Sequence, residues 1–474
     1  MAFWQLEQHP AEAVALLHGS HPISYGELAI LSDAASARLP RRRTLGFLSM
    51  PNQVDAVALY LGALRSQLHV PLLLQSDLDP VLLGTLATHY RPDWVALSFA
   101  QKAPSGYSPL PTDPANARTG LVIYLRDGDI PLPPPRDRLA LLLNTSGSTG
   151  SSKLVRHSAE AIASNAGSIV EYLGLNARDR AITTLPLAYS YGMSILNSHL
   201  HAGASLVLSD HPLVSREFWN LARDSGITSL SGVPATFEML RRLDLAKQRL
   251  PLLRTLTQAG GRLREALVEH FDQIARQLDL SFFVMYGQTE AAPRISYVPP
   301  DRLAGKIGSI GIPVPGGELN VDNDTGELLY RGPNVMLGYA EQRADLALGD
   351  CQGGMLRTGD LARIDDEGYF YLTGRAKRFI KISGNRINLD EVEAMLAREL
   401  NGLFACTGSD DDLVVFTTPA SLAEANTVRQ LIQQRYKLFH GHIRALTLED
   451  LPLMSTGKID YAALLALSQQ RSTP

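Results

Sequence analysis

The feature that most constrains the fold is an alternation of short apolar runs and amphipathic stretches along the chain. Each apolar run has the length of a buried strand, and each amphipathic stretch has the 3.6-residue spacing of a helix. The predicted strands are Leu139–Leu143, Ala181–Leu185, Ser205–Leu208, Ile227–Leu230, Leu253–Leu256 and Phe282–Tyr286. The predicted helices are Gln53–Gln67, Ser158–Leu173, Pro234–Leu243 and Glu265–Leu278. Strands and helices that alternate in this way predict a layered α/β domain with largely parallel strands.

A change of pattern follows in the last third of the chain. From Ile307 to Leu372, short apolar segments are separated by Gly, Pro and Asp-Asn, which predicts a small β-barrel appended to the larger domain. The remainder carries amphipathic stretches near Leu389–Leu400 and Leu422–Tyr436. Because 474 residues are too many for one core, we predict a large N-terminal α/β domain at 1–376 and a small α+β C-terminal domain at 377–474.

Composition excludes several classes of protein. Apolar residues make up 45% and charged residues 19% of the chain, which is ordinary for a globular protein and unlike a disordered or fibrous one. The net charge of −4 gives no sign of the basic face that nucleic-acid binders carry. Two cysteines, Cys351 and Cys406, cannot form a disulfide framework, so free thiols are expected. Without a signal peptide or a membrane span, we expect a cytoplasmic protein with no nucleic-acid or membrane partner.

A loop rich in serine and glycine follows the first predicted strand of the alternating region. It reads Thr145, Ser146, Gly147, Ser148, Thr149, Gly150, Ser151, Ser152 and Lys153. Its backbone N–H groups can converge on an anion, its hydroxyls add donors, and Lys153 adds a positive charge. The alternative is a flexible linker, which a position between a strand and a helix disfavours. We therefore predict a phosphate-binding loop, which lacks the spacing of a Walker A motif.

A second candidate group follows the predicted strand Phe282–Tyr286, and consists of Tyr286, Gly287, Gln288, Thr289 and Glu290. Ligands of open α/β sheets bind at the carboxyl ends of strands, where these residues are predicted to lie. Tyr286 offers a ring for a base, Thr289 a hydroxyl for a phosphate and Glu290 an oxygen ligand for Mg²⁺. Taken alone, a Tyr-Gly turn with a solvated glutamate would be the favoured interpretation, and the motif gains weight only from the other groups.

Two further groups lie nearer the C-terminus. Asp360, in Thr-Gly-Asp, can accept the two hydroxyls of a ribose, with Arg375 close to it; the alternative is a surface salt bridge between them. Lys458 lies in Ser-Thr-Gly-Lys and is either a solvated lysine or a mobile ammonium. An ammonium beside a reacting carboxylate and α-phosphate would stabilise the charge that develops there.

In this order, the four groups resemble those of the adenylate-forming superfamily, which includes acyl-CoA and aryl-CoA synthetases, adenylation domains of nonribosomal peptide synthetases and luciferase. Weaker matching blocks lie at 24–28, 232–236, 259–263 and 326–332. The resemblance covers nearly the whole chain. It implies a mobile C-terminal domain, with ATP and Mg²⁺ as cofactors.

The resemblance also implies residue roles. The ATP or AMP site is implied to contain Thr145 to Gly150 and Lys153 for the β- and γ-phosphates, Gly260, Gly261, Arg262 and Tyr286 around adenine, then Gly287, Gln288, Thr289, Asp360 and Arg375. The implied catalytic residues are Lys458, Thr289, Glu290 and Lys153, with Glu290 as the metal ligand. Lys377 matches the hinge, and Lys381 and Gly384 lie on the face for the thiol step.

The acyl pocket has only candidate residues, which are Tyr189, Ser190, Gly192, Met193, Ser231, Gly232, Ala259 and Gly260. Members that activate amino acids carry an aspartate in the block around Tyr189 to pair with the ammonium group. None lies between Leu185 and Leu196. A buried cation without a counter-charge is costly, so we predict an aryl or acyl acid rather than an amino acid.

The expected activity is that of an ATP-dependent acid–thiol ligase, which forms an acyl-AMP and then a thioester. The acceptor is either CoA or the phosphopantetheine of an acyl carrier protein, with a slight preference for the carrier protein because the front of the chain is short for this superfamily. Two alternatives remain open, namely an amide-forming ligase and a catalytically silent nucleotide-binding regulator.

Overall fold

The computed structural model describes residues 2–19, 21–99, 101–111, 120–128, 135–136, 138–144, 153–375, 378–382, 385–400, 402–409, 411–419, 425–436, 438–454 and 458–470. Their contacts divide the chain into two compact units. The first unit comprises Met1–Glu318 and Tyr330–Leu356, and the second comprises Leu319–Leu329 and Arg357–Pro474. The domain boundary predicted at 376/377 stays a prediction.

The first unit contains two large sheets. One sheet has, in spatial order, β16 (Ile312–Pro313), β15 (Arg294–Val298), β14 (Ser281–Gly287), β13 (Thr255–Gln258), β12 (Ser229–Gly232), β10 (Arg180–Ile182), β11 (Ser205–Leu208), β1 (Val14–His18) and β2 (His21–Ser24). The run from β14 to β1 is parallel. The predicted parallel α/β arrangement is thus confirmed for this sheet.

The other sheet has, in spatial order, β19 (Gly338–Ala340), β9 (Leu154–Ser158), β8 (Leu139–Asn144), β4 (His69–Leu74), β3 (Thr44–Ser49), β5 (Trp94–Ser98), β7 (Leu121–Arg126) and β6 (Tyr107–Pro109). Its centre is parallel and its outer strands are antiparallel. Its central strands are buried along their whole length, as expected of strands covered on both faces.

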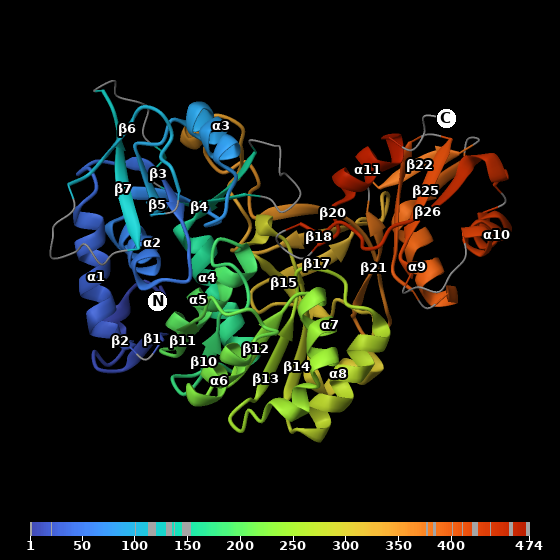
Figure 1. Cartoon of the computed structure of the whole chain (residues 1–474), viewed down its shortest axis with the longest axis horizontal. Coiled ribbons are helices and arrows are strands. Elements are labelled where there is room, and N and C mark those ends of the chain that lie inside the picture. The colour runs from blue at the N-terminus through green and yellow to red at the C-terminus, as the bar shows by residue number, and fades with distance from the viewer. Residues whose placement is uncertain are drawn as a thin grey trace. The chain divides into compact units, whose positions relative to one another are not determined.

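Helices fill the layers around these sheets (Figure 1). The helices of the unit are α1 (Tyr25–Ala37), α2 (Val54–Ser66), α3 (Pro80–Tyr90), α4 (Ala159–Leu173), α5 (Ser190–His201), α6 (Arg216–Asp224), α7 (Pro234–Leu243) and α8 (Glu265–Gln277). α4 and α5 contact each other, and each contacts a sheet, α4 through β8 and β9 and α5 through β10 and β11. α7 and α8 cover the other face of the first sheet, where Phe237, Phe271 and Phe282 pack together.

The helix after the serine-rich loop begins where the sequence indicated. The hydroxyl of Ser158 accepts a hydrogen bond from the backbone N–H of Ala161, and α4 ends at Gly174 in the left-handed conformation. A hydroxyl residue at the N-cap and a glycine after the last turn satisfy backbone groups that the helix cannot satisfy itself. The predicted helices at 53–67, 234–243 and 265–278 are also confirmed, to within a residue at each end.

The serine-rich loop was predicted to lie between a strand and the helix that begins at Ser158, and the structure adds a strand before that helix. Residues Leu154–Ser158 form β9, which pairs antiparallel with β8, so the loop at 145–152 connects two strands of a hairpin. Strand β9 was hard to predict because it contains Arg156 and His157, which are fully buried through contacts distant in sequence. The loop residues Thr145 to Ser152 themselves lie outside the described residues.

The second unit contains three small sheets and three helices in its described residues. A four-stranded sheet has the order β17 (Glu318–Val321), β18 (Glu327–Arg331), β20 (Met355–Ile364), β21 (Phe370–Arg375) and comes from the region predicted to form a barrel. Two other strands of that region, β16 and β19, belong to the large sheets of the first unit. The other elements are the hairpin of β22 (Phe379–Ile382) and β23 (Asn385–Asn388), the sheet of β24 (Phe404–Ser409), β25 (Asp412–Thr417) and β26 (Ile443–Thr447), and the helices α9 (Leu389–Leu400), α10 (Ala425–Tyr436) and α11 (Tyr461–Gln470).

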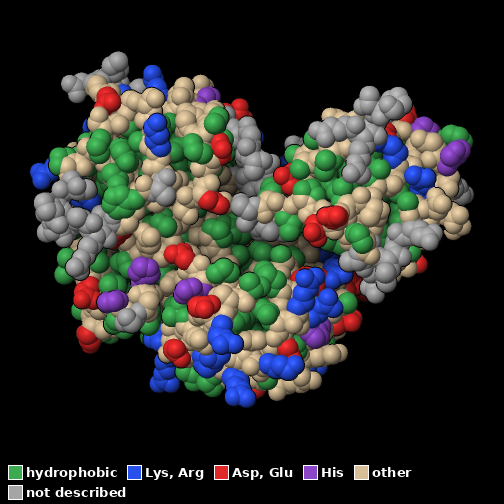
Figure 2. All heavy atoms as spheres, in the orientation of Figure 1, with side chains coloured by type: hydrophobic (Ala, Val, Ile, Leu, Met, Phe, Trp, Pro, Cys, Tyr) green, Lys and Arg blue, Asp and Glu red, His purple; other side chains and the backbone are tan. Residues whose placement is uncertain are grey.

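The surface mixes charges of both signs. Lys and Arg side chains gather in Figure 2 over the region of α7 and α8. Acids of the same region pair with them, as in Arg264 with Glu238, Arg262 with Glu265 and Arg276 with Asp272. Both cysteines are free, Cys351 exposed and Cys406 buried. No helix in the described part of the chain is long and apolar enough to cross a membrane.

Candidate active site

Predicted site residues follow three neighbouring strands of the parallel sheet of the first unit. Strands β12, β13 and β14 are parallel neighbours, with Gly232 opposite Gln258 and Gln258 opposite Val284. The residues that follow each strand therefore emerge at the same edge. This is where α/β sheets bind ligands.

Gly260 and Tyr189 lie against each other at this edge. Gly260 has a φ of +82°, and a Cβ added to it would come within 2.7 Å of the Tyr189 hydroxyl. Tyr189 precedes α5 and is only 8% exposed. Burial raises the pKa of Tyr189 to about 12, so its hydroxyl is neutral at physiological pH. A larger residue at 260 would displace the Tyr189 side chain, so glycine is needed there to keep Tyr189 in its position before α5.

Thr289 is held from two directions. Its hydroxyl oxygen lies 3.4 Å from that of Ser190, and its backbone carbonyl accepts a hydrogen bond of 2.8 Å from Nε2 of His157. His157 is fully buried, and burial lowers its pKa to about 4. A neutral imidazole therefore fixes the backbone of Thr289. Sequence reasoning missed His157 because nothing local marks β9 as part of the site.

Tyr339 connects the predicted metal ligand to the predicted phosphate lysine. Its hydroxyl donates to Oε1 of Glu290 at 2.9 Å, and Nζ of Lys153 lies 3.8 Å from the centre of its ring. Lys153 is also 3.8 Å from the carboxylate of Glu341. Strand β19 aligns Tyr339 with Val155 of β9, which places these groups side by side. Tyr339 was not predicted, although it follows a glycine at the start of a short strand.

The turn after β14 is shaped by its glycine. A Cβ at Gly287 would come within 1.8 Å of the carbonyl oxygen of Pro293, so no larger residue fits there. The side chain of Gln288 donates to the hydroxyl of Tyr286 at 3.0 Å. Arg262 is exposed and lies 3.4 Å from Glu265. The structure thus brings Tyr286, Gln288 and Thr289 to one turn.

Arg294 is a buried cation that the sequence did not reveal. It is 3% exposed, and its guanidinium carbon lies 4.1 Å from the centre of the Tyr191 ring. It makes no ion pair with an acid among the described residues, and its Nε has no hydrogen-bond partner there. The side chains of Asn165 and Asn334 donate to its backbone carbonyl. Its charge opposes the effect of burial on the pKa of Tyr189, so its field reaches that hydroxyl.

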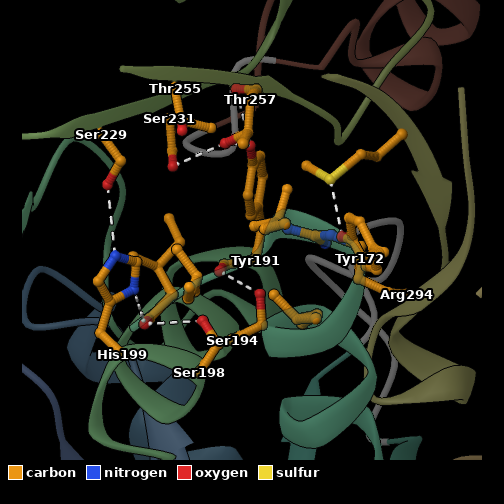
Figure 3. A pocket seen from close by; sticks show the side chains of 15 residues that line it. Tyr172, Tyr191, Ser194, Ser198, His199, Ser229, Ser231, Thr255, Thr257 and Arg294 are labelled. Atoms are coloured by element: carbon orange, nitrogen blue, oxygen red, sulfur yellow. Dashed lines mark hydrogen bonds between the residues drawn. The ribbon is translucent and has the colours of Figure 1, made fainter. Parts of the chain in front are cut away.

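Beside Tyr191 lies a small cavity of about 20 Å³, which several hydroxyl side chains and His199 help to line (Figure 3). Tyr191 donates to the carbonyl of Thr257 at 2.9 Å, and the Thr257 hydroxyl donates to that of Ser231 at 2.8 Å. His199 donates through Nδ1 to the Ile195 carbonyl at 2.8 Å, which leaves Nε2, 3.3 Å from the Ser229 hydroxyl, as an acceptor. This volume suits about one water molecule, so the cavity is too small for an acyl chain.

The other pocket candidates are buried at the same edge. Met193 is 1% and Ala259 2% exposed, and Gly192 lies in α5. Gly232 ends β12, and Gly261 accepts a hydrogen bond of 2.9 Å from Gln258. None of these contacts identifies a ligand, so the pocket list stays a prediction.

Asp360 and Arg375 belong to the second unit. They are opposite each other in β20 and β21, with Nε of Arg375 3.3 Å from Oδ1 of Asp360. The Asp360 side chain is 8% exposed, whereas that of Arg375 is 61% exposed. The ion pair weighed as the alternative is present, and the predicted contact with a ribose remains open.

Lys458 belongs to the second unit. The backbone N–H of Met454 donates to the Lys458 carbonyl at 2.8 Å, and Leu453 bridges to Ile459. Lys381 is exposed on β22. Lys377 and Gly384 lie outside the described residues.

Comparisons with known proteins identify the family of the chain. A family model described as AMP-binding enzyme matches residues 2–340. The chain is 31% identical to the indoleacetate–CoA ligase of Aromatoleum aromaticum, over 67% of this chain and 65% of that protein. It is 27% identical to the 2-succinylbenzoate–CoA ligase of Listeria innocua, over 68% of each. The matched region thus spans about two thirds of each relative.

Solved structures share the fold. The o-succinylbenzoate coenzyme A synthetase of Bacillus subtilis, in complex with ATP and magnesium, superposes with a TM-score of 0.78, 21% identity and 98% of this chain and 99% of that chain covered. ATP-bound MatB from Rhodopseudomonas palustris superposes with a TM-score of 0.76 and 20% identity, and the match covers 99% of this chain and 100% of that chain. The predicted fold class, with a large N-terminal and a small C-terminal domain, is confirmed. With the family model covering most of the sequence, the chain belongs to the AMP-binding enzyme family.

Proposed function

We propose that this protein is an AMP-forming acid–thiol ligase, which activates an aryl or acyl carboxylate with ATP and transfers the acyl group to a thiol. The observation that carries the proposal is the connected group of Lys153, Tyr339 and Glu290 beside the buried Thr289. A cation for phosphates and a carboxylate for a metal are thereby held at the carboxyl edge of a parallel sheet, on residues predicted for these roles.

In the first step, a carboxylate oxygen of the acid attacks the α-phosphorus of ATP, and pyrophosphate leaves. The substrate is its own nucleophile, so the protein contributes mainly position and charge stabilisation. Thr289 offers a hydroxyl to the α-phosphate, and His157 fixes the backbone that carries it. Lys153 offers its ammonium to the departing phosphates, and Lys458 is the ammonium proposed to stabilise the charge that develops on the α-phosphate.

Glu290 is suited to hold Mg²⁺. One carboxylate oxygen accepts from Tyr339, which leaves the other available as a hard ligand. The described residues contain no cluster of three or more His, Cys, Asp or Glu side chains suited to a metal. A single carboxylate fits Mg²⁺, which usually keeps several waters and takes its remaining ligands from phosphates. When bound, the ion neutralises phosphate charge.

The substrate class follows from the charges around Tyr189. Helix α5 begins at Ser190 without an acid near it in sequence, and the nearby buried charge is the cation Arg294. A substrate ammonium would be repelled there, whereas a carboxylate would be attracted. We therefore propose a carboxylic acid without an α-amino group. The relatives named above, which act on indoleacetate and 2-succinylbenzoate, support an aryl acid.

In the second step, a thiolate attacks the acyl carbonyl of the acyl-AMP, and AMP leaves. CoA is the favoured acceptor, because the relatives are named as CoA ligases. The phosphopantetheine of a carrier protein is the alternative. For the second unit, we propose that Asp360 and Arg375 bind the ribose, that Lys377 is the hinge between domains at 1–376 and 377–474, and that Lys381 and Gly384 belong to the face used in the thiol step. The cytoplasm is the proposed location.

A competition assay tests the acceptor. The enzyme is given ATP, Mg²⁺ and an acid that it adenylates, together with equal concentrations of CoA, a phosphopantetheine-loaded carrier protein and an amine. Formation of acyl-CoA supports the proposal, and transfer to the carrier protein selects the alternative acceptor. Amide as the main product, or no transfer to any acceptor, would contradict the thiol ligase.

A further inference from the structure

A partly buried arginine at the start of the second unit's core ties several elements together. Arg378 follows residues 376–377 and its side chain is 17% exposed. Its Nη2 donates to Oε1 of Glu393 and to the carbonyl of Cys406, each at 2.8 Å, and its Nη1 contacts Asp390. Arg378 thereby joins the chain before β22 to helix α9 and strand β24.

Tyr461 completes this cluster from another part of the sequence. The guanidinium carbon of Arg378 lies 3.9 Å from the centre of the Tyr461 ring, and the Tyr461 hydroxyl donates to Oε2 of Glu393 at 3.0 Å. The backbone N–H of Cys406 donates to Oε1 of Glu393 at 2.6 Å. Both carboxylate oxygens of Glu393 are therefore engaged, one by Arg378 and Cys406 and the other by Tyr461.

Tyr461 is also the first residue of α11, just after the Lys458 turn. The backbone N–H of Asp460 donates to the Pro452 carbonyl at 2.8 Å, and its side chain accepts from Ala463 at 2.9 Å. Ile459 and Tyr461 pack beside a small core of Ala405, Val414, Phe416, Leu451 and Leu464. The backbone just after Lys458 is thus fixed by the polar contacts of Asp460 and Tyr461.

The polar contacts of the cluster are better explained by a need for one fixed arrangement than by a need for stability. Apolar residues of similar volume often replace a buried ion pair with little change in stability, and buried polar groups can instead select a single arrangement. Burial and the charge of Glu393 both raise the pKa of Tyr461, which keeps its hydroxyl protonated as a donor. Three directional contacts on one carboxylate allow few alternative positions for α11.

We propose that Arg378, Glu393 and Tyr461 are positioning residues for Lys458, because they tie the start of α11, three residues after Lys458, to the chain before β22, to α9 and to β24. This inference rests on the proposed function, because it takes Lys458 as the lysine of adenylation.

The test compares two arginines of the same unit. Arg378→Met removes the cluster's cation. Arg444→Met is the matched control, because Arg444 pairs with Asp412 and donates to the Ser468 carbonyl of α11 but contacts none of the three cluster residues. Tyr461→Phe is a milder variant that keeps the ring and removes only the hydroxyl bond, should Arg378→Met fail to fold. Adenylation is followed by acid-dependent pyrophosphate exchange, and thioester formation from supplied acyl-adenylate is followed separately.

For Tyr461→Phe we expect the kcat of adenylation to fall about 10-fold, with KM for ATP and the rate of the thioester step unchanged. Arg444→Met should keep the wild-type rate. In a Lys458→Ala background, Tyr461→Phe should cause no further loss, because it acts through Lys458. A further 10-fold loss in that background, or an equal fall in both half-reactions, would overturn the proposal. Absence of exchange in the wild type would instead refute the proposed function.

Discussion

Two arginines that are shielded from solvent, one in each unit, have opposite charge environments. Arg294 lies against Tyr191 with no acid beside it and an unpartnered Nε among the described residues. Arg378 contacts Asp390 and Glu393 and lies over Tyr461. Among the described residues, the first charge has no acid paired with it, whereas the second is paired with two. An uncompensated buried charge favours an oppositely charged ligand, and a saturated one favours a single fixed structure.

The neighbours of the two arginines show the same contrast. Near the first, burial raises the pKa of Tyr189 to about 12 and keeps its hydroxyl neutral, against the opposing charge of Arg294. Around the second, burial by itself would lower the pKa of Arg378, but the charge and hydrogen bonds of Glu393 reverse this and the net shift is upward. The first region thus suits the substrate environment proposed above, and the second suits the positioning role proposed for Arg378.

The largest expected effect is on the stability of the second unit. Arg378→Met leaves Glu393 and Asp390 without their cation, and we expect the free energy of unfolding to fall by about 3–5 kcal/mol. Urea denaturation followed by the near-ultraviolet signal of that unit's tyrosines measures this. A loss no larger than that of Arg444→Met would show that the cluster is not saturated as described.

The next effect concerns chemistry. Lys458→Ala should lower the rate of adenylation by about 100-fold or more, the size seen when one charge-stabilising donor is removed. The rate of thioester formation from supplied acyl-adenylate should remain close to that of the wild type. Single-turnover measurement of each half-reaction separates the two. A wild-type adenylation rate would remove Lys458 from the mechanism.

A neutral histidine of the first unit predicts a pH dependence. Because the pKa of His157 is about 4 in the folded protein, below the 6.5 of an unperturbed imidazole, the unfolded chain binds more protons between these values. The stability associated with neutral His157 is complete above pH 6.5 and is lost as the pH falls towards 4. The free energy of unfolding should decrease by up to about 3 kcal/mol over this range. Melting temperatures of wild type and His157→Gln between pH 7 and 4 should converge. Parallel curves would contradict this assignment.

The smallest effect distinguishes the two arginines most sharply. Arg294→Met should raise the free energy of unfolding by about 1 kcal/mol, because it removes an uncompensated buried charge. The same change should raise KM for the acid about 10-fold, as for the loss of one charge-assisted hydrogen bond, and leave KM for ATP unchanged. Destabilisation together with an unaltered KM for the acid would show that Arg294 serves only the fold.

The parts that sequence predicted are those with local signals. Helix α4 was placed correctly because Ser158 caps it and an apolar face repeats along it. Strand β9 was not, because buried Arg156 is satisfied by the carbonyls of Tyr339, Leu348 and Leu337, far along the chain. Such contacts leave no local pattern.

The same reason explains the missed site residues. Thr289 and Glu290 follow an apolar run, which pointed to them. Tyr339, His157 and Arg294 matter only because other segments lie against them, as Asn165 and Asn334 do at the carbonyl of Arg294. The resemblance to a known superfamily identified the chemistry, and the structure identified what holds its residues in place.

The central claim is acid-dependent adenylation at the edge of the parallel sheet. The most direct test is exchange of labelled pyrophosphate into ATP by the whole chain with Mg²⁺, across aryl acids, fatty acids, dicarboxylic acids and amino acids. The account predicts exchange that depends on an aryl or acyl acid and is absent with α-amino acids. Exchange with α-amino acids alone, or with no acid at all while ATP still binds, would contradict it.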